Sequence, residues 1–364
     1  MSGASETRPT WADVDVAAFR RNVATITALL PDGARLVAVL KADGYGHGAL
    51  PLAHACKDRV AMIAVALLEE ALVLRRGGID TPLLVLGPLT APQVRLAIEA
   101  DIAIGVVGPE ELALVRDTEA RIHLKLDSGM GRMGVIENEL PLVIEMIRSA
   151  RRLRVEGIYT HFANADEPGD EYTLAQIANY DRMLATLRNA GIDAPMHHLA
   201  NSGATLRRLV RPGELARVGI ALFGPGPTAP TEPVLRWRTE ILRLKELPAG
   251  HPVGYGTTWR APRPTRIATL PVGYADGYSR ALSNNGDVLI HGRRAPVVGR
   301  VSMDLTTIDV TDIPAAAYGD EVILLGTQGE GRITAEELAA RTGTISYAIL
   351  TGIGARVPRR HQNS

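Results

Sequence analysis

The sequence predicts a (β/α)8 barrel of the TIM type in the N-terminal part of the chain, followed by a mostly β C-terminal domain. From Trp11 to about Pro227, short apolar runs alternate with longer amphipathic segments, which is the pattern of repeated β-α units. Beyond Pro233, short strand-like runs follow one another without long helices between them. Because 364 residues exceed what one core usually serves, we expect two domains, residues 1–232 and residues 233–364.

Eight apolar runs in the first domain have the length and composition of strands that are covered on both faces. Eight parallel strands are the number that closes an α/β barrel. The expected strands are Leu36–Leu40, Val60–Val65, Leu83–Leu86, Ile102–Val107, Ile122–Leu126, Val155–Thr160, Met196–Leu199 and Leu215–Val218. Between them, Asp15 can cap a helix over Val16–Leu30, and two more helices are expected over Leu67–Arg76 and Thr173–Asn189.

The second domain begins after Phe223–Pro233, a segment crowded with glycine and proline. One late helix is expected there, around Thr334–Arg341. The expected strands of the second domain are Ile241–Leu244, Ile267–Leu270, Val288–Ile290, Pro296–Val301, Thr306–Val310 and Val322–Leu325.

Charge and composition exclude several classes of function. Lys and Arg together number 40 and so do Asp and Glu, so no net field attracts the chain to nucleic acid or to an anionic membrane surface. A small, roughly neutral substrate fits better. The segment Met1–Pro9 lacks the apolar core of a signal peptide, and no run is long enough to span a bilayer. We therefore expect a cytoplasmic protein.

No metal centre is expected. Cys56 is the only cysteine, which excludes an internal disulfide and a thiolate cluster. His197 and His198 are adjacent on an expected strand and point to opposite faces, and no other histidine spacing is typical of zinc.

Lys41 stands at the carboxyl end of the expected strand Leu36–Leu40, directly before a glycine-rich turn. Barrels place catalytic side chains at this end of their strands, and a lysine that is desolvated there becomes a usable amine nucleophile. For this segment alone, the alternative is a lysine whose amine reaches to solvent before a tight turn. The glycines do not have the Gly-x-Gly-x-x-Gly spacing that a doubly wound dinucleotide-binding sheet would need.

The segment Val39–Gly48, VLKADGYGHG, resembles the pyridoxal-phosphate attachment motif of the alanine racemases, a barrel-type (fold type III) family. In that family the matching lysine forms the internal Schiff base with the cofactor. The resemblance implies that Lys41 and Tyr45 bind pyridoxal 5'-phosphate. It runs from about Trp11 to Pro358, with the motifs of both domains in order.

The resemblance implies roles for further residues of the barrel. Arg132 would hydrogen-bond the phenolic oxygen of the cofactor and contact the substrate, and Lys125, when carbamylated, would steady it. His161 would lie beside the cofactor. Arg217 would face the pyridine nitrogen; because arginine does not release its proton, that nitrogen should stay unprotonated, which would restrain side reactions such as transamination. The matching residues around the phosphate are Asn201, Ser202, Gly219 and Ile220.

The second domain matches the family in the segments GYGTTW, VGYADGYSR and VGRVSMD. Tyr255 would be the second catalytic base, opposite Lys41. Tyr274 would line the entrance, and the backbone of Met303 would help to hold the substrate carboxylate. Tyr347 would contact the phosphate and narrow the mouth of the site. Ser302 stands where the family often has cysteine.

The sequence is therefore interpreted as that of a pyridoxal-phosphate-dependent isomerase that interconverts L-alanine and D-alanine with two bases, a lysine and a tyrosine. The resemblance implies a head-to-tail homodimer with shared active sites, which supplies D-alanine for peptidoglycan or degrades it. Alternatives are a racemase of broader or serine specificity on the same fold, a related amino-acid decarboxylase, and a non-catalytic pyridoxal-phosphate-binding protein. The last of these would leave the stretch beyond Pro233 unexplained.

Overall fold

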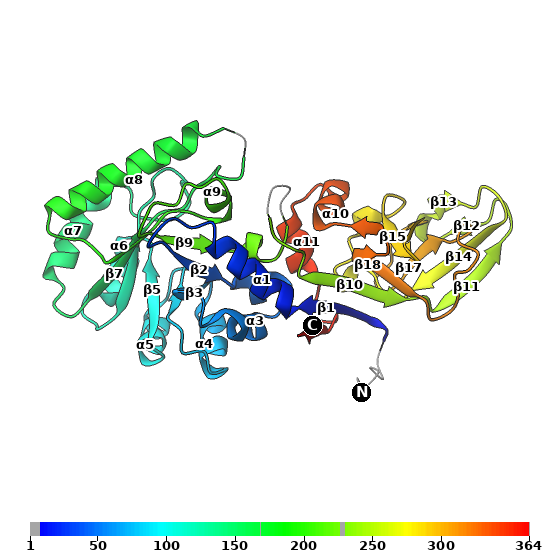
Figure 1. Cartoon of the computed structure of the whole chain (residues 1–364), viewed down its shortest axis with the longest axis horizontal. Helices are drawn as coiled ribbons and strands as arrows, with labels where there is room; N and C mark the ends of the chain where they lie inside the picture. Colours follow the sequence, from blue (N-terminus) through cyan, green and yellow to red (C-terminus); the bar gives the residue numbers. More distant parts are fainter. Residues whose placement is uncertain (1–7, 168, 226–229, 364) are drawn as a thin grey trace. The chain divides into compact units, whose positions relative to one another are not determined.

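The chain folds into two compact units (Figure 1). The computed structural model describes residues 8–167, 169–225 and 230–363. Phe19–Thr231 forms one unit, and residues 8–18 together with residues 232–363 form the other.

The first unit is built on eight parallel strands in the order β8-β7-β6-β5-β4-β3-β2-β9. They are β2 (Arg35–Val39), β3 (Met62–Val65), β4 (Leu83–Val85), β5 (Ile102–Val106), β6 (Arg121–Lys125), β7 (Arg154–Tyr159), β8 (Met196–His198) and β9 (Leu215–Val218). Among the described residues no ladder joins β8 to β9, but the Arg217 N–H donates to the Ala200 carbonyl oxygen at 2.9 Å across this seam. The expected barrel is confirmed, and it is nearly closed.

Helices lie on the outside of these strands (Figure 1). They are α1 (Val16–Thr27), α3 (Ala49–Cys56), α4 (Leu68–Arg76), α5 (Ala91–Glu99), α6 (Pro109–Val115), α7 (Leu140–Ser149) and α8 (Glu171–Asn189), with short turns α2 (Lys41–Gly46), η1 (Glu137–Glu139), α9 (Ser202–Leu206) and η2 (Ile220–Leu222) in the loops. Asp15 caps α1 as expected, because its carboxylate accepts from the Ala18 N–H at 2.8 Å.

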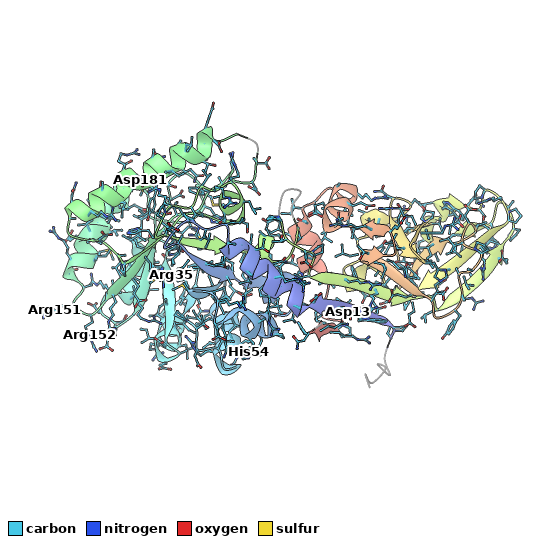
Figure 2. All side chains as sticks on the ribbon, viewed as in Figure 1. Asp13, Arg35, His54, Arg151, Arg152 and Asp181 are labelled. Carbon is cyan, nitrogen blue, oxygen red and sulfur yellow. The ribbon has the colours of Figure 1, made fainter. Side chains whose placement is uncertain are left out.

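The two ends of the barrel differ in chemistry. Arg151 and Arg152, in the turn before β7, lie at the outer edge of this unit (Figure 2). They stand at the amino-terminal ends of the strands. The candidate site residues instead follow the strands, at the carboxyl-terminal ends, where α/β barrels carry their chemistry.

The second unit is a β structure with two helices at its C-terminal end. A seven-stranded sheet has the order β16-β15-β18-β10-β1-β20 with β19 paired to β18, a three-stranded sheet has the order β11-β14-β17, and β12 pairs with β13. The strands are β1 (Thr10–Asp15), β10 (Leu235–Glu240), β11 (Arg243–Leu247), β12 (Pro252–Val253), β13 (Trp259–Arg260), β14 (Thr265–Leu270), β15 (Asp287–Ile290), β16 (Arg293–Pro296), β17 (Thr306–Asp309), β18 (Glu321–Gln328), β19 (Gly331–Ile333) and β20 (Arg359–Gln362). The helices are α10 (Ala335–Thr342) and α11 (Ser346–Gly352), and the 3-10 turns are η3 (Tyr255–Thr257), η4 (Tyr274–Asp276) and η5 (Arg280–Leu282).

The N-terminal segment belongs to this β unit and not to the barrel, to which the sequence analysis assigned residues 1–232. Strand β1 pairs antiparallel with β10 and parallel with β20, so both of its edges are used. Arg8, just before it, makes two 2.7 Å hydrogen bonds to the fully buried carboxylate of Asp276. Residues 226–229, within the expected boundary segment, lie outside the described residues.

Two expected strands of the second domain are wrong. The chain turns at Ile241 and Leu242, between β10 and β11, so only Arg243 and Leu244 of the expected strand Ile241–Leu244 belong to a strand, β11. Most of the expected strand Pro296–Val301 is a loop, because Gly299 adopts a φ of +76° and its N–H donates to the Asn284 side chain at 2.6 Å.

Candidate active site

Lys41 follows Leu40 directly at the end of β2 and is half-buried. Burial lowers the pKa of its amine, the Arg132 cation lowers it further, and the Glu70 carboxylate opposes both. The sequence contains only four lysines, Lys41, Lys57, Lys125 and Lys245. Two of the four therefore lie in the predicted site.

The turn after Lys41 is left-handed over four consecutive residues, Ala42 to Tyr45, with φ between 51° and 63°. Such a conformation costs roughly 1–2 kcal/mol for each residue with a side chain, so it needs support. The Asp43 carboxylate accepts from the Ala49 N–H at 2.7 Å, and His47 Nδ1 lies 3.0 Å from the Gly44 carbonyl oxygen. These contacts fix the turn directly after the lysine.

Tyr45 is brought by this turn against the loop after β9. Its ring packs on Phe223 at 5.1 Å between centroids. A Cβ atom at position 219 would lie only 2.1 Å from the Tyr45 hydroxyl oxygen. Gly219 is therefore required here by close approach, and its backbone and the phenol share one small cradle.

Ser202 and the residues after β9 complete the cradle. The Ser202 hydroxyl accepts from the Gly219 N–H at 3.1 Å, and Ile220 begins η2 directly after it. Asn201 caps α9, with its side chain accepting from the Ala204 N–H at 3.0 Å. A hydroxyl and several backbone N–H groups in the loops after the last two strands are the donor set with which barrels bind phosphate.

Arg217 on β9 is only 4% exposed. Its guanidinium donates to the Thr160 carbonyl oxygen at 2.6 Å, to His198 Nδ1 at 3.0 Å and to His161 Nδ1 at 3.2 Å. Burial lowers the pKa of Arg217 to about 10, so the group stays charged at neutral pH. Burial and the Arg217 cation together hold the pKa of His161 well below its usual range, which makes His161 neutral.

Lys125 and Arg132 add two more cations. Lys125, at the end of β6, is 6% exposed, and burial followed by the Arg132 and Arg217 cations lowers its pKa to about 8. Arg132 lies on the glycine loop after β6 and is exposed. The Asp127 carboxylate supports this loop by accepting the Gly129, Met130 and Gly131 N–H groups. The carboxyl end of the barrel is thus strongly electropositive.

In the β unit the loops that carry Tyr274 and Met303 adjoin. The Tyr274 and Ala275 N–H groups donate to the Ser302 and Met303 carbonyl oxygens, each at 3.0 Å. Tyr255, Tyr274 and Met303 are 72%, 42% and 53% exposed. Tyr347 lies half-buried on α11.

The structure thus brings ten of the predicted residues together in the barrel unit: Lys41, Tyr45, Lys125, Arg132, His161, Asn201, Ser202, Arg217, Gly219 and Ile220. The remaining four, Tyr255, Tyr274, Met303 and Tyr347, belong to the β unit. Sequence reasoning missed Glu70, whose carboxylate also accepts from the Asp43 N–H at 3.3 Å, and the buried histidines His123 and His198. The only sequence signal for the two histidines was the position of each one within an apolar strand.

In the described part of the chain, no group of three or more His, Cys, Asp or Glu side chains could hold a metal ion. None of the helices in these residues is long and apolar enough to cross a membrane.

The fold is that of a barrel enzyme, with a half-buried lysine at the carboxyl end of β2. Residues 14–227 match the family "Alanine racemase, N-terminal domain", and residues 234–361 match "Alanine racemase, C-terminal domain". The chain therefore belongs to the alanine racemase family.

Individual relatives agree with this assignment. The chain is 41% identical to the alanine racemase of Halothermothrix orenii, with 98% of each chain covered, and 43% identical to that of Symbiobacterium thermophilum, with 97% of each covered. It resembles the crystal structure of alanine racemase from Bacillus anthracis with bound L-Ala-P, with a TM-score of 0.93, 38% identity, and 99% of this chain and 97% of that chain covered. The alanine racemase of Streptomyces lavendulae gives a TM-score of 0.92 at 35% identity, with 99% and 98% covered.

Proposed function

We propose that the protein interconverts L-alanine and D-alanine with pyridoxal 5'-phosphate as its cofactor. The observation that carries the proposal is the half-buried Lys41, whose pKa is lowered mainly by burial, next to a cradle of phosphate-binding donors. The family assignment supports the same reaction. Matches in both domains argue against a carrier that resembles the barrel alone.

The residues present fit this cofactor. Gly219 lacks a Cβ atom, which lets the Tyr45 phenol approach its backbone, and the Ser202 hydroxyl lies within hydrogen-bond distance of the Gly219 N–H group. These groups, with Asn201 positioning α9 and Tyr347, would hold the phosphate. Bound pyridoxal phosphate draws electrons from the substrate Cα atom and so makes its α-proton acidic.

Lys41 and Tyr255 would be the two bases, because racemisation removes a proton from one face of a carbon and returns one to the other. Lys41 also would hold the cofactor through its amine. Arg132 and the backbone of Met303 would bind the substrate carboxylate, and Arg132 would also donate to the phenolic oxygen of the cofactor.

Arg217 would face the pyridine nitrogen, with the neutral His161 beside the cofactor. Arg217 keeps its proton at neutral pH, so it would donate a hydrogen bond without transferring the proton. This would weaken the electron sink and favour racemisation over transamination.

Lys125 would carry a carbamate. A carbamate forms from the neutral amine, and the pKa of about 8 leaves a substantial neutral fraction near neutral pH. The resulting anion would pair with Arg132 and relieve the crowding of cations in the site.

The active unit would be a homodimer in which Lys41 of one chain works with Tyr255 of the other. The exposure of Tyr255, Tyr274 and Met303 supports this, because large apolar side chains on a single chain are suited to an interface. Tyr274 and Tyr347 would then narrow the entrance and favour a methyl side chain. A cytoplasmic location, and a role in supplying D-alanine for peptidoglycan or in degrading it, complete the proposal.

Borohydride reduction tests the proposal most simply. The purified enzyme should be yellow and should convert either enantiomer of alanine to the other. Reduction with borohydride should remove both the colour and the activity. Peptide mass mapping should then find the cofactor on Lys41, with Lys57 and Lys245 as internal controls in the same digest. A label on any other lysine, or no label, would remove Lys41 from its proposed role.

A further inference from the structure

Three buried aromatic side chains continue from Arg217 into the barrel interior. His198 on β8 and His123 on β6 are completely buried, and Tyr159 on β7 is 2% exposed. Arg217 donates to His198 Nδ1 at 3.0 Å, and His198 Nε2 lies 2.7 Å from His123 Nδ1. The Tyr159 ring stacks on the His198 ring at 4.7 Å between centroids, and the guanidinium of Arg217 lies 5.1 Å from the centre of the Tyr159 ring.

The proton positions in this chain follow from the chemistry of its members. A guanidinium has donors only, so His198 Nδ1 must accept and carries no proton. Burial, followed by the Arg217 cation, holds the pKa of His198 well below its usual range, so the ring is neutral and its one proton is on Nε2.

The same reasoning extends to His123. The His198 Nε2–H group points its proton at His123 Nδ1, which must therefore accept. Burial lowers the pKa of His123 to about 3, so this ring is also neutral and its proton is on Nε2. Arg217 donates to His198, and His198 donates to His123. A proton could therefore be passed back towards Arg217 only if every hydrogen bond in this chain changed direction.

The barrel makes room for His123 in a specific way. The ladder between β6 and β7 shifts register between Ile122 and His123, which places Gly157 opposite His123. A Cβ atom at position 157 would lie 2.1 Å from His123 Nδ1. A register shift and a glycine inside a buried strand both weaken the ladder, and here they admit one imidazole ring.

The two ring nitrogens of His123 differ in their surroundings. Its Nε2–H group has no hydrogen-bond partner among the described residues, and neither does the Tyr159 hydroxyl. A leucine of similar size would remove that donor, but it would leave the buried Nε2–H group of His198 without an acceptor, which is equally costly. The benefit of the imidazole is therefore its Nδ1 atom, the acceptor for His198.

We propose that His123 is a positioning residue that acts through His198 to hold the Arg217 guanidinium in one orientation. The inference rests on the proposed role of Arg217. His123 fixes the tautomer and ring orientation of His198, and His198 fixes one arm of the guanidinium, while the Thr160 carbonyl oxygen and His161 fix the other. The orientation of the Arg217 guanidinium is then set by buried side chains of the barrel interior.

The proton positions can be read by NMR from the purified enzyme labelled with ¹⁵N in its histidine rings. Both His123 and His198 should carry their proton on Nε2, a scalar coupling should connect His198 Nε2 with His123 Nδ1, and neither ring should titrate between about pH 5 and pH 8. A proton on Nδ1 of either ring, a missing coupling, or a titration in that range would overturn the inference.

A pair of variants tests the consequence for catalysis. His123→Leu removes the acceptor for His198, and kcat for alanine racemisation should fall roughly tenfold with little change in KM, because one buried donor is left unpaired. His123→Asn can place an amide oxygen where Nδ1 lies and should restore most of the loss. His197→Leu, on the outer face of β8 where His197 bonds Tyr180, is the matched control and should leave kcat unchanged.

Two outcomes of this comparison contradict the proposal: an asparagine variant as slow as the leucine variant, or a leucine variant as fast as the wild type. The NMR measurement needs neither substrate nor turnover. A failure there would leave the proposed reaction standing, since that is tested separately by borohydride labelling of Lys41.

Discussion

The groups around Arg217 determine how its guanidinium is held and how far its pKa is lowered. The backbone carbonyl oxygens and imidazole nitrogens around it accept from its guanidinium, and lysine could not match this forked set of donors. Its pKa of about 10 still lies well above neutral pH. The residue can therefore polarise a partner by a hydrogen bond without giving up its proton.

Arg217→Glu should expose what the arginine restrains. A carboxyl group facing the pyridine nitrogen could share a proton with it and strengthen the electron sink. We expect racemisation to slow on the order of tenfold to a hundredfold, a new long-wavelength absorbance during turnover, and measurable conversion of alanine to pyruvate. Arg152→Glu, which makes the same charge change at an exposed side chain before β7, is the control. Wild-type rates and spectra in Arg217→Glu would show that this arginine is wrongly assigned.

Lys125 gives a second test at this scale. Its lowered pKa, about 8, predicts reaction with carbon dioxide at pH values where an ordinary lysine stays protonated. Enzyme in ¹³C-bicarbonate at about pH 8 should show one carbamate carbon signal by NMR, which disappears on acidification. The signal should be absent from Lys125→Met and present in Lys245→Met, which removes an exposed lysine instead. A signal that survives in Lys125→Met would assign the carbamate to another amine.

Among the elements of the barrel unit, the left-handed turn Ala42–Tyr45 connects Lys41 with the proposed phosphate cradle. It places Tyr45 over Gly219, so the turn after β2 and the loop after β9 form one surface. β2 and β9 are neighbouring strands of the barrel, so this contact spans only the ladder between them.

Gly219→Ala should disturb this surface. The added Cβ atom would lie 2.1 Å from the Tyr45 hydroxyl oxygen, so the ring or the loop must move. Overpacking of this kind costs about 1–3 kcal/mol, which corresponds to a loss of cofactor affinity of about fivefold to somewhat over a hundredfold if the cost falls on the bound state. Gly352→Ala, where no atom lies within 4 Å of the new Cβ, is the control. Equal cofactor affinity, measured by titration and absorbance, in Gly219→Ala and wild type would contradict the proposed cradle.

An element of this protein can be predicted from its own residues when they alone determine its structure. It cannot be predicted in this way when contacts with other segments determine it. The eight barrel strands are visible as apolar runs because both of their faces are buried, as at Val37 and Ala38. The left-handed turn was not predicted, because three of its four residues carry side chains that normally avoid this conformation. It is fixed by later contacts such as Asp43 with Ala49.

Long-range pairing explains the remaining differences. Strand β1 was assigned to the barrel because it lies next to the barrel in sequence, but its ladder partners β10 and β20 lie far along the chain. Likewise, the motif residues of the site could be named from a resemblance, whereas His123 could not. Its role depends on the register shift between β6 and β7 and on Gly157.

At the scale of the whole molecule, the proposed reaction needs both units. Lys41 lies in the barrel unit and Tyr255 in the β unit, where 72% of Tyr255 is exposed. A symmetric homodimer with shared sites would supply each base from a different chain. The central claim, two bases on one substrate carbon, is then also a claim about assembly.

The measurement that tests this claim most directly is activity in mixed dimers of Lys41→Ala and Tyr255→Phe, each inactive or nearly so alone. In a mixed dimer one site collects both substitutions, while the other receives an intact Lys41 and an intact Tyr255. Random exchange of equal amounts makes about half of the dimers mixed, with one good site each, so roughly a quarter of wild-type L- to D-alanine conversion should return. If mass spectrometry confirms exchange and no activity returns, Lys41 and Tyr255 do not act together across two chains.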